Sequence, residues 1–126
     1  MRLLLALLII FAAVISLGFW TNHLLQASAS ELLQNIGQIE QGLERNQWDK
    51  AYAQTAELEK VWDKKAKWWP TVLDHSEIDN IEFSMAKVKE YVATKNTALS
   101  RGQLSELKLM IKHIPEKETI RLKNIL

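Results

Sequence analysis

Apolar residues recur with a helical period along most of the chain. In four stretches they are mostly spaced three and four residues apart, which places them on one face of an α-helix. These stretches are 25–43, 48–62, 78–92 and 104–114. Strand signals, such as alternating β-branched runs bounded by Asn-Gly or Asp-Gly turns, are absent from the sequence. Because short connections make successive helices antiparallel neighbours, the pattern predicts an all-α fold with an up-down bundle of about four helices.

The beginning of the chain has a different pattern. Residues 3–20 are predominantly apolar and carry no charge, and as a helix they extend about 27 Å, close to the thickness of the hydrocarbon layer of a bilayer. Arg2 and the α-amino group precede this run, and the next formal charge is Glu31. Positive charge on the N-terminal side favours an inside N-terminus. We therefore predict a single-pass transmembrane anchor over residues 1–22 and an extracytoplasmic helical domain over residues 23–126, at the outer face of the cytoplasmic membrane.

A cleavable signal peptide is the alternative for the same stretch. Ala27, Ser28 and Ala29 fit the small-x-small pattern that precedes a cleavage site. The apolar run, however, is longer than the usual signal-peptide core of about 7 to 15 residues, and Leu24 and Leu25 continue the helical pattern beyond it. The length favours an uncleaved anchor, and cleavage after Ala29 stays open at this point.

Two pairs of residues resemble helix starts. Asn46 is followed three residues later by Asp49, and Ser76 is followed by Asp79. A short polar residue followed three residues on by an acid is typical of a capped helix N-terminus. We predict that the first helix ends near residues 44–46, that Asn46 caps the second helix and that Ser76 caps the third.

The helix ends are predicted from prolines and polar stretches. Proline disfavours helical backbone at the residue before it, which here is Trp69. The second helix should therefore end at Trp69, and residues 70–73 should form a short helical turn. The polar stretch 94–102 should close the third helix, and Pro115 should end the fourth or start a last short piece. The tail 116–126 carries four aliphatic residues, so we expect it to dock on the bundle.

Composition and charge exclude several classes of function. A chain of 126 residues holds one domain. The net charge of +1 and the isoelectric point near 8.0 give no basic field for a nucleic-acid partner. Without cysteine there is no disulfide framework, no thiolate nucleophile and no thiolate metal site. We predict no cofactor and no nucleic-acid binding.

The most unusual stretch is 62–79, which holds three of the five tryptophans. Trp62 belongs to the apolar stripe of the second helix. Trp68 and Trp69 are neighbours, and neighbouring side chains at a helix end point about 100° apart, so we expect one of the two to be only half covered. An aromatic surface beside lysines suits an amphipathic partner or the lipid interface. We predict Trp68 and Trp69 as weak binding residues.

Lysines at positions 60, 64, 65 and 67 make the last turns of the second helix basic. Cations at a helix C-terminus are stabilised by the backbone dipole. We favour this account over an anionic partner such as lipid headgroups or a wall polymer.

His75, Glu77 and Asp79 form the one cluster in the sequence that resembles a metal or acid-base site. Residues two apart at a helix start point to different sides, and neither His23 nor His113 completes a metal-binding spacing. We expect helix capping and a buried, hydrogen-bonded His75, with binding contacts at all three positions as the weaker hypothesis. His113 can approach His75 only if the third and fourth helices bring both to one end. We predict no catalytic residues, no metal and no enzyme activity.

Motifs along nearly the whole chain resemble one known family. They are Trp48-x-x-Ala51, Trp62, Trp68, His75-Ser76-Glu77-Ile78-Asp79, Leu104, Leu107, Lys108, His113-Ile114 and Asn124-Ile125-Leu126. This pattern resembles a family of short uncharacterised membrane proteins from spore-forming bacteria, classified only as a domain of unknown function. The resemblance implies one membrane segment, a helical extracytoplasmic part and no assigned activity. No residue in the sequence points to sporulation, and a link to it would rest only on the kind of organism in which the family occurs.

The leading prediction is a membrane-anchored helical interaction module that recruits a protein partner outside the cytoplasmic membrane. An anchor joined directly to a one-domain bundle without a catalytic constellation favours it. The alternative is a small envelope-acting enzyme, or a ligand-binding or metal-binding protein, that uses the corner of His75, Glu77 and Asp79. Self-association through the stripe at 25–43 is a third hypothesis.

Overall fold

A computed structural model describes residues 1–69 and 73–125, with side chains described up to Glu116. Its helices are α1 (Arg2–Glu44), α2 (Trp48–Ala66), α3 (His75–Ala93) and α4 (Thr97–Ile125). Within these described residues the regular structure is all helix, which confirms the predicted fold class.

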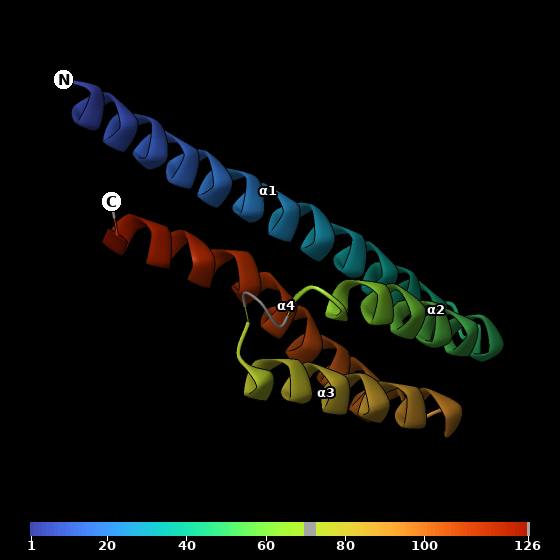
Figure 1. The fold of residues 1–126 in the computed structure, drawn as a ribbon. Coiled ribbons are helices and arrows are strands. Elements are labelled where there is room, and N and C mark those ends of the chain that lie inside the picture. The colour runs from blue at the N-terminus through green and yellow to red at the C-terminus, as the bar shows by residue number, and fades with distance from the viewer. Residues whose placement is uncertain (70–72, 126) are drawn as a thin grey trace.

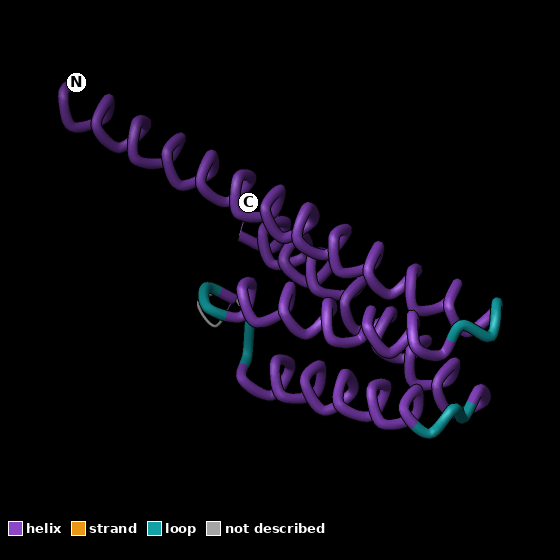
Figure 2. Tube along the Cα trace, turned by 90° about the vertical axis from the view of Figure 1, so that its right-hand side faces the viewer, coloured by secondary structure: helices purple, strands orange, loops and turns teal. Residues whose placement is uncertain are grey.

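The helices form a four-helix bundle in which successive helices run antiparallel (Figures 1 and 2). α1 packs against α2 and α4, and α3 packs against the same two helices. The N-terminal part of α1 projects beyond the bundle. The up-down arrangement predicted from the short connections is confirmed.

The predicted apolar stripes form the core. Its stripe residues are Leu25, Leu32, Ile36, Ile39 and Leu43 on α1, Ala51, Thr55, Leu58 and Trp62 on α2, Ile78, Ile81, Met85, Val88 and Val92 on α3, and Leu104, Leu107, Ile111 and Ile114 on α4. Tyr52, which is an apolar position within the stretch 48–62, is 42% exposed and does not belong to the core. It follows Ala51 and is therefore turned about 100° away from the core.

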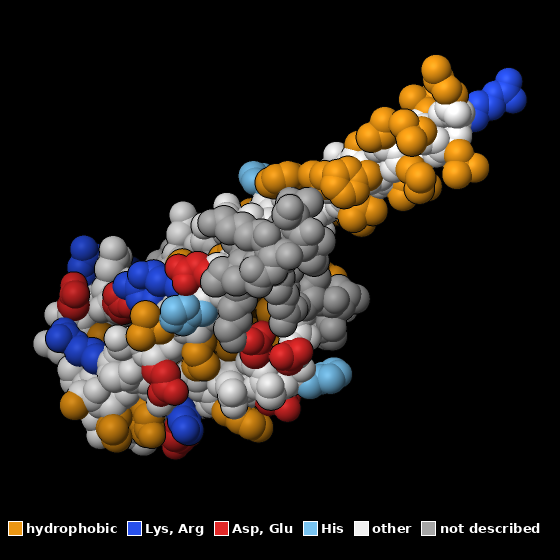
Figure 3. All heavy atoms as spheres, turned by 90° about the vertical axis from the view of Figure 1, so that its left-hand side faces the viewer, with side chains coloured by type: hydrophobic (Ala, Val, Ile, Leu, Met, Phe, Trp, Pro, Cys, Tyr) orange, Lys and Arg blue, Asp and Glu red, His pale blue; other side chains and the backbone are white. Residues whose placement is uncertain are grey.

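α1 continues without a break from its apolar part into the bundle. Leu3 is 78% exposed and Trp20 is 59% exposed, whereas Leu25 is fully buried. Figure 3 shows the apolar side chains of the projecting part on the outside of an isolated helix. α1 is long and apolar enough for a membrane span or a signal sequence. We call residues 3–20 the apolar segment.

The turn between α1 and α2 corrects one predicted cap. Asn46 has a positive φ of 56°. Its N–H donates to the carbonyl of Leu43 (3.3 Å), and the N–H of Gln47 donates to the carbonyl of Gly42 (2.8 Å). These two bonds close the end of α1 in a Schellman motif. Asn46 therefore terminates α1 instead of capping α2, because asparagine tolerates the left-handed conformation that this motif requires.

A close contact follows directly from this turn. A Cβ atom on Gly42 would lie 3.0 Å from the Cβ of Ala51, whereas one on Gly37 would meet no atom within 4 Å. The lack of a side chain at Gly42 therefore lets α1 and α2 approach closely where the chain reverses.

The start of α3 also differs from the prediction. α3 begins at His75 after Asp74, whose backbone is extended (φ −69°, ψ 147°). The acid three residues after the N-cap is therefore Glu77, so Ser76 lies inside the first turn. α2 ends at Ala66, slightly before Pro70. The predicted turn at 70–73 falls mostly outside the described residues.

α4 begins earlier and ends later than predicted. The Oδ1 atom of Asn96 accepts a hydrogen bond from the N–H of Leu99 (3.0 Å) and caps a helix that starts at Thr97. Pro115 lies inside α4, which continues to Ile125. The prediction that Pro115 ends the fourth helix or starts a last short piece was wrong, because a proline removes only one backbone donor and the flanking turns can continue the helix. Docking of the tail side chains after Glu116 falls outside the described side chains.

Candidate functional site

The tryptophan-rich corner lies at the end of the bundle from which the apolar segment projects (Figure 1). The Nζ atom of Lys65, in the last turn of α2, lies 2.6 Å from the Oε2 atom of Glu31 on α1. Glu31 follows Trp20 by eleven residues, which is about 16 Å along the helix. We call the end of the bundle from which the apolar segment projects the near end. It comprises the end of α2, the start of α3 and the second half of α4.

Trp62 and Trp69 form the centre of the corner. Trp62 is 1% exposed and Trp69 is fully buried. Their rings meet edge to face, with centroids 5.0 Å apart and planes at 85°. Trp68 contacts the Trp69 ring in a second edge contact at 5.8 Å but is only half buried. As expected for adjacent side chains, one of the pair is packed and the other is partly exposed.

The two buried indoles differ in their hydrogen bonds. The Nε1–H of Trp62 donates to the Oε1 atom of Glu82 on α3 at 3.1 Å. The Nε1–H of Trp69 is buried and meets no acceptor in the part of the chain that the structure describes. Trp62 therefore joins α2 to α3 through a polar contact, whereas the indole ring of Trp69 contributes its packing against Trp62 and Trp68.

His75 and Asp79 are exposed, and Glu77 is half buried. The prediction of a buried His75 was wrong, because His75 is the first residue of α3 and the bundle does not cover it. Among residues 1–69 and 73–116, whose side chains the structure describes, no group of three or more histidine or carboxylate side chains is placed to hold a metal ion. The three residues therefore do not form one site: His75 and Asp79 face solvent, and Glu77 is partly covered.

A small cleft between α3 and α4 brings Glu77 and His113 to the same end of the bundle. The cleft has a volume of about 170 Å3 and is lined by Glu77, Asn80, Ile81, Met110, His113 and Ile114. The Nδ1 atom of His113 lies 3.1 Å from the Oε2 atom of Glu116. The sequence analysis missed Asn80 and Met110, which lie beside the apolar stripes of α3 and α4. They line the same cleft because of the way in which the two helices are aligned, and the sequence does not specify this alignment. The cleft suits a small apolar group beside polar side chains.

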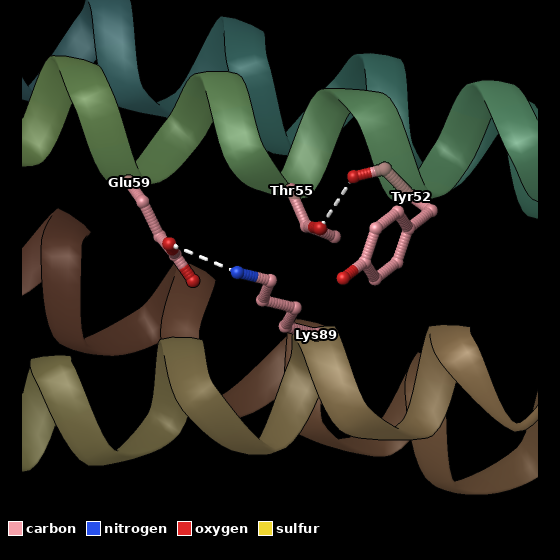
Figure 4. Close-up of polar contacts among 4 residues, drawn as sticks. All are labelled: Tyr52, Thr55, Glu59 and Lys89. Carbon is pink, nitrogen blue, oxygen red and sulfur yellow. Dashed lines mark hydrogen bonds and ion pairs between the residues drawn. The ribbon is translucent and has the colours of Figure 1, made fainter.

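The α2–α3 face carries a second polar cluster (Figure 4). The Nζ atom of Lys89 lies 3.4 Å from the Oε2 atom of Glu59 and 5.9 Å from the centre of the Tyr52 ring. Thr55 donates to the backbone carbonyl of Tyr52 (2.6 Å). Because both charged side chains are partly exposed, the ion pair stabilises the fold by at most about 1 kcal/mol. The ion pair and the contact with the Tyr52 ring join α2 to α3.

Comparison with known proteins gives one match. The model of a domain of unknown function, DUF4363, matches residues 19–125. No curated protein and no solved structure matches the chain. The matched range begins at the end of the apolar segment and covers the bundle. The resemblance is confirmed at the level of a domain of unknown function, and an origin in spore-forming bacteria stays a prediction.

Proposed function

We propose that this chain, which belongs to the DUF4363 family of domains of unknown function, is a single-pass membrane-anchored interaction module. Its bundle would lie at the outer face of the cytoplasmic membrane and recruit a protein partner there. The observation that carries the proposal is the continuity of α1, whose uncovered apolar segment leads directly into the core of the bundle.

The apolar segment supports membrane insertion. Its large apolar side chains are more than half exposed along most of the helix, and those from Leu3 to Ile10 are all at least 57% exposed. Soluble monomers rarely leave a contiguous apolar surface of this length in contact with water. Insertion into the bilayer would remove it from water and would satisfy the backbone through the helix itself.

The core supports an anchor that is retained. Ala27, Ser28 and Ala29 lie in the middle of α1, and Ala29 is buried. Cleavage after Ala29 would separate Leu25, a fully buried core residue, from the bundle. We therefore favour an uncleaved span over a signal peptide. The position of Arg2 before the span supports an inside N-terminus by the positive-inside tendency.

Trp68 is the strongest candidate for a partner contact. Its ring is half buried and is held against Trp69, so it can contribute contact area with little loss of side-chain freedom. Lys64 and Lys67 are exposed beside it in the sequence. A partly fixed tryptophan flanked by charges resembles the anchor and rim of a protein interface. A partner at this position would have to reach the membrane surface.

Binding of a small ligand is a second candidate function. The cleft between α3 and α4 favours it, because Glu77 and His113 line the same space as three apolar side chains. The volume of about 170 Å3 is below the roughly 300 to 1,000 Å3 of typical ligand pockets, so we rank it second.

A photo-crosslinking amino acid at position 68 tests the proposed recruitment. We expect the full chain, expressed in its own membranes, to form a discrete adduct with a protein. The matched control is the same amino acid at Phe83, an exposed aromatic position on α3, which should form none. An adduct of twice the chain mass would indicate self-association instead, and adducts with lipid alone at position 68 would contradict a protein partner there.

A further inference from the structure

We infer that the cleft between α3 and α4 binds a primary alkylammonium group, and that its occupant is a lysine side chain of the protein partner. This inference deepens the proposed function and rests on it. The bundle consists of two equivalent helical hairpins, and in the first of them a lysine of the chain itself fills the position that corresponds to the cleft.

The two hairpins, α1–α2 and α3–α4, reverse through the same turn. Lys95 has a positive φ of 58°, close to the 56° of Asn46. The N–H of Lys95 donates to the carbonyl of Val92 (3.0 Å), and the N–H of Asn96 donates to the carbonyl of Tyr91 (3.0 Å). These bonds repeat the Schellman motif that ends α1. Equivalent residues of the two hairpins therefore differ by 49 in number, as Asn46 and Lys95 do.

The buried core follows the same relation. Its equivalent residues on α1 and α3 are Ala29 and Ile78, Leu32 and Ile81, Ile36 and Met85, Ile39 and Val88, and Leu43 and Val92. Those on α2 and α4 are Thr55 and Leu104, Leu58 and Leu107, and Trp62 and Ile111. The two hairpins therefore bury the same face at each of these positions.

Two ion pairs between the hairpins occupy equivalent positions with opposite polarity. Lys89 of α3 pairs with Glu59 of α2 at 3.4 Å, and Glu40 of α1 pairs with Lys108 of α4 at 3.5 Å. Glu40 corresponds to Lys89, and Glu59 corresponds to Lys108. The hairpins are therefore related by an approximate twofold rotation. Because α1 and α3 run in the same direction, its axis is parallel to the bundle and equivalent residues lie at about the same level.

The position that corresponds to the cleft differs between the hairpins. In the first hairpin, the Nζ atom of Lys65 lies 2.6 Å from the Oε2 atom of Glu31, and the Lys65 side chain is only 13% exposed. The equivalent residues of the second hairpin are Ile114 and Asn80, which both line the cleft of about 170 Å3. Isoleucine is shorter than lysine and carries no charge. The second hairpin therefore has a cleft where the first holds the stem and the ammonium group of a lysine.

The lining of the cleft suits the same group from another molecule. Ile81, Met110 and Ile114 offer an apolar wall, against which the methylene stem of a lysine can pack. Glu77 supplies a carboxylate and Asn80 a side-chain carbonyl oxygen, and both accept hydrogen bonds from an ammonium group. A cavity of about 150 Å3 admits benzene in an engineered protein. The cleft is therefore large enough for a lysine side chain, which has fewer heavy atoms than benzene.

The charge around the cleft favours a cationic occupant. Residues 74–86, which include the α3 wall of the cleft, carry four carboxylates and no lysine or arginine. On the α4 wall, His113 lies 3.1 Å from the carboxylate of Glu116. Complementary charge selects a partner and suppresses partners of like charge. An anionic group would be repelled at this place.

The level of the cleft favours a protein lysine over a lipid amine. Asn80 corresponds to Glu31, which lies about 16 Å along α1 beyond Trp20. The headgroup layer extends only about 5 to 8 Å beyond the hydrocarbon on each side of a bilayer. With the apolar segment inserted as proposed, an ethanolamine headgroup would not extend as far as the cleft, whereas a protein bound at the near end can reach it.

Titration of the full chain with Nα-acetyl-lysine N-methylamide tests the inference. The chain carries isotope-labelled methionine methyl groups and is reconstituted in phosphatidylcholine bicelles for NMR. Met110 lines the cleft, whereas Met85 is buried in the core, and Met110→Leu assigns the signal. We expect the Met110 signal to shift in a saturable way, with a Kd in the millimolar range, while the Met85 signal stays in place. The norleucine analogue, which lacks the ammonium group, should cause no saturable shift.

Charge substitutions test the role of the carboxylate. Glu77→Gln should weaken binding of the lysine analogue about threefold to fivefold, the upper part of the range for partly exposed ion pairs. The matched control is Asp79→Asn, because Asp79 is exposed and does not line the cleft, and it should leave the Kd unchanged. Equal shifts with the lysine and norleucine analogues, or a Kd indifferent to Glu77→Gln, would overturn the inference.

A transplanted ion pair should block the cleft. Asn80→Glu with Ile114→Lys gives the second hairpin the residues that form the Glu31–Lys65 pair in the first. The new lysine should occupy the cleft and abolish the saturable shift of the Met110 signal. Circular dichroism confirms that this variant and Glu77→Gln keep their helical content. Binding that persists in a folded double variant would contradict the assigned position of the ammonium group.

Phosphatidylethanolamine tests the lipid as a source of the amine. Replacing part of the phosphatidylcholine with this lipid should leave the Met110 signal in place. A shift caused by the lipid, to which the lysine analogue adds nothing, would make the headgroup the occupant and would overturn the assignment to a protein lysine.

The titration needs no partner, so its result is separate from cross-linking at position 68. A flat titration together with a protein adduct at position 68 would overturn the inference and leave the proposed recruitment standing. A saturable shift without any adduct would support the ammonium site and contradict recruitment through Trp68.

Discussion

Replacing Trp62 with alanine is expected to lower the free energy of unfolding of the bundle by about 3 to 5 kcal/mol. The Trp62 side chain is 1% exposed and packs edge to face on Trp69. Its removal would leave a cavity in the corner and would abolish the hydrogen bond to Glu82. Because single domains are stable by only about 5 to 15 kcal/mol, much of the total would be lost.

Thermal melting of the full chain in detergent, followed by circular dichroism, measures this effect. Each kcal/mol corresponds to about 4 to 8 °C for a domain of this size. The control is Trp62→Phe, which retains an aromatic ring but not the N–H that Glu82 accepts, and which should melt between the wild type and the alanine variant. Melting of Trp62→Ala with the wild type would place Trp62 outside the core.

Trp69→Ala is expected to have a similar cost of about 3 to 5 kcal/mol, since Trp69 is fully buried between the rings of Trp62 and Trp68. Trp69→Phe should cost much less, because the indole N–H that it removes has no acceptor among the described residues. The phenylalanine substitution should therefore be better tolerated at position 69 than at position 62.

Trp68→Ala provides the matched comparison for the neighbouring position. Its ring is half exposed, so the loss of stability should be clearly smaller than for Trp69→Ala in the same melting experiment. If all three tryptophans prove equally destabilising when replaced by alanine, the corner is a hydrophobic plug. The hypothesis that it presents a binding surface would then be abandoned.

The apolar stripes could be predicted from the sequence because the spacing of apolar residues along a helix is local, and the face that it defines is the one that packs in a bundle. The helix caps were harder to predict, because asparagine is common both at the start and just after the end of a helix. Asn46 is a preferred N-cap residue, but it also tolerates the positive φ that ends α1. Pro115 stops a helix by the local rule, and the continuation of α4 past it depends on the turns on both sides.

The candidate site depended on tertiary register, which the stripes do not specify. The sequence indicated that one of Trp68 and Trp69 would be covered, but the path of the chain after Ala66 determined that it is Trp69. The cleft that contains Glu77 and His113 required the relative position of α3 and α4. The exposure of His75 followed from a helix start one residue before the predicted Ser76 cap.

Protease digestion of intact spheroplasts that produce the full chain tests the central claim most directly. The account predicts that untreated cells contain a chain with its original N-terminus, and that external protease digests the bundle while a short N-terminal fragment stays protected. A detergent-treated sample shows that the bundle can be cut. A bundle that survives external protease but not protease in detergent, or a chain that begins after Ala29, would contradict a retained anchor with the bundle outside.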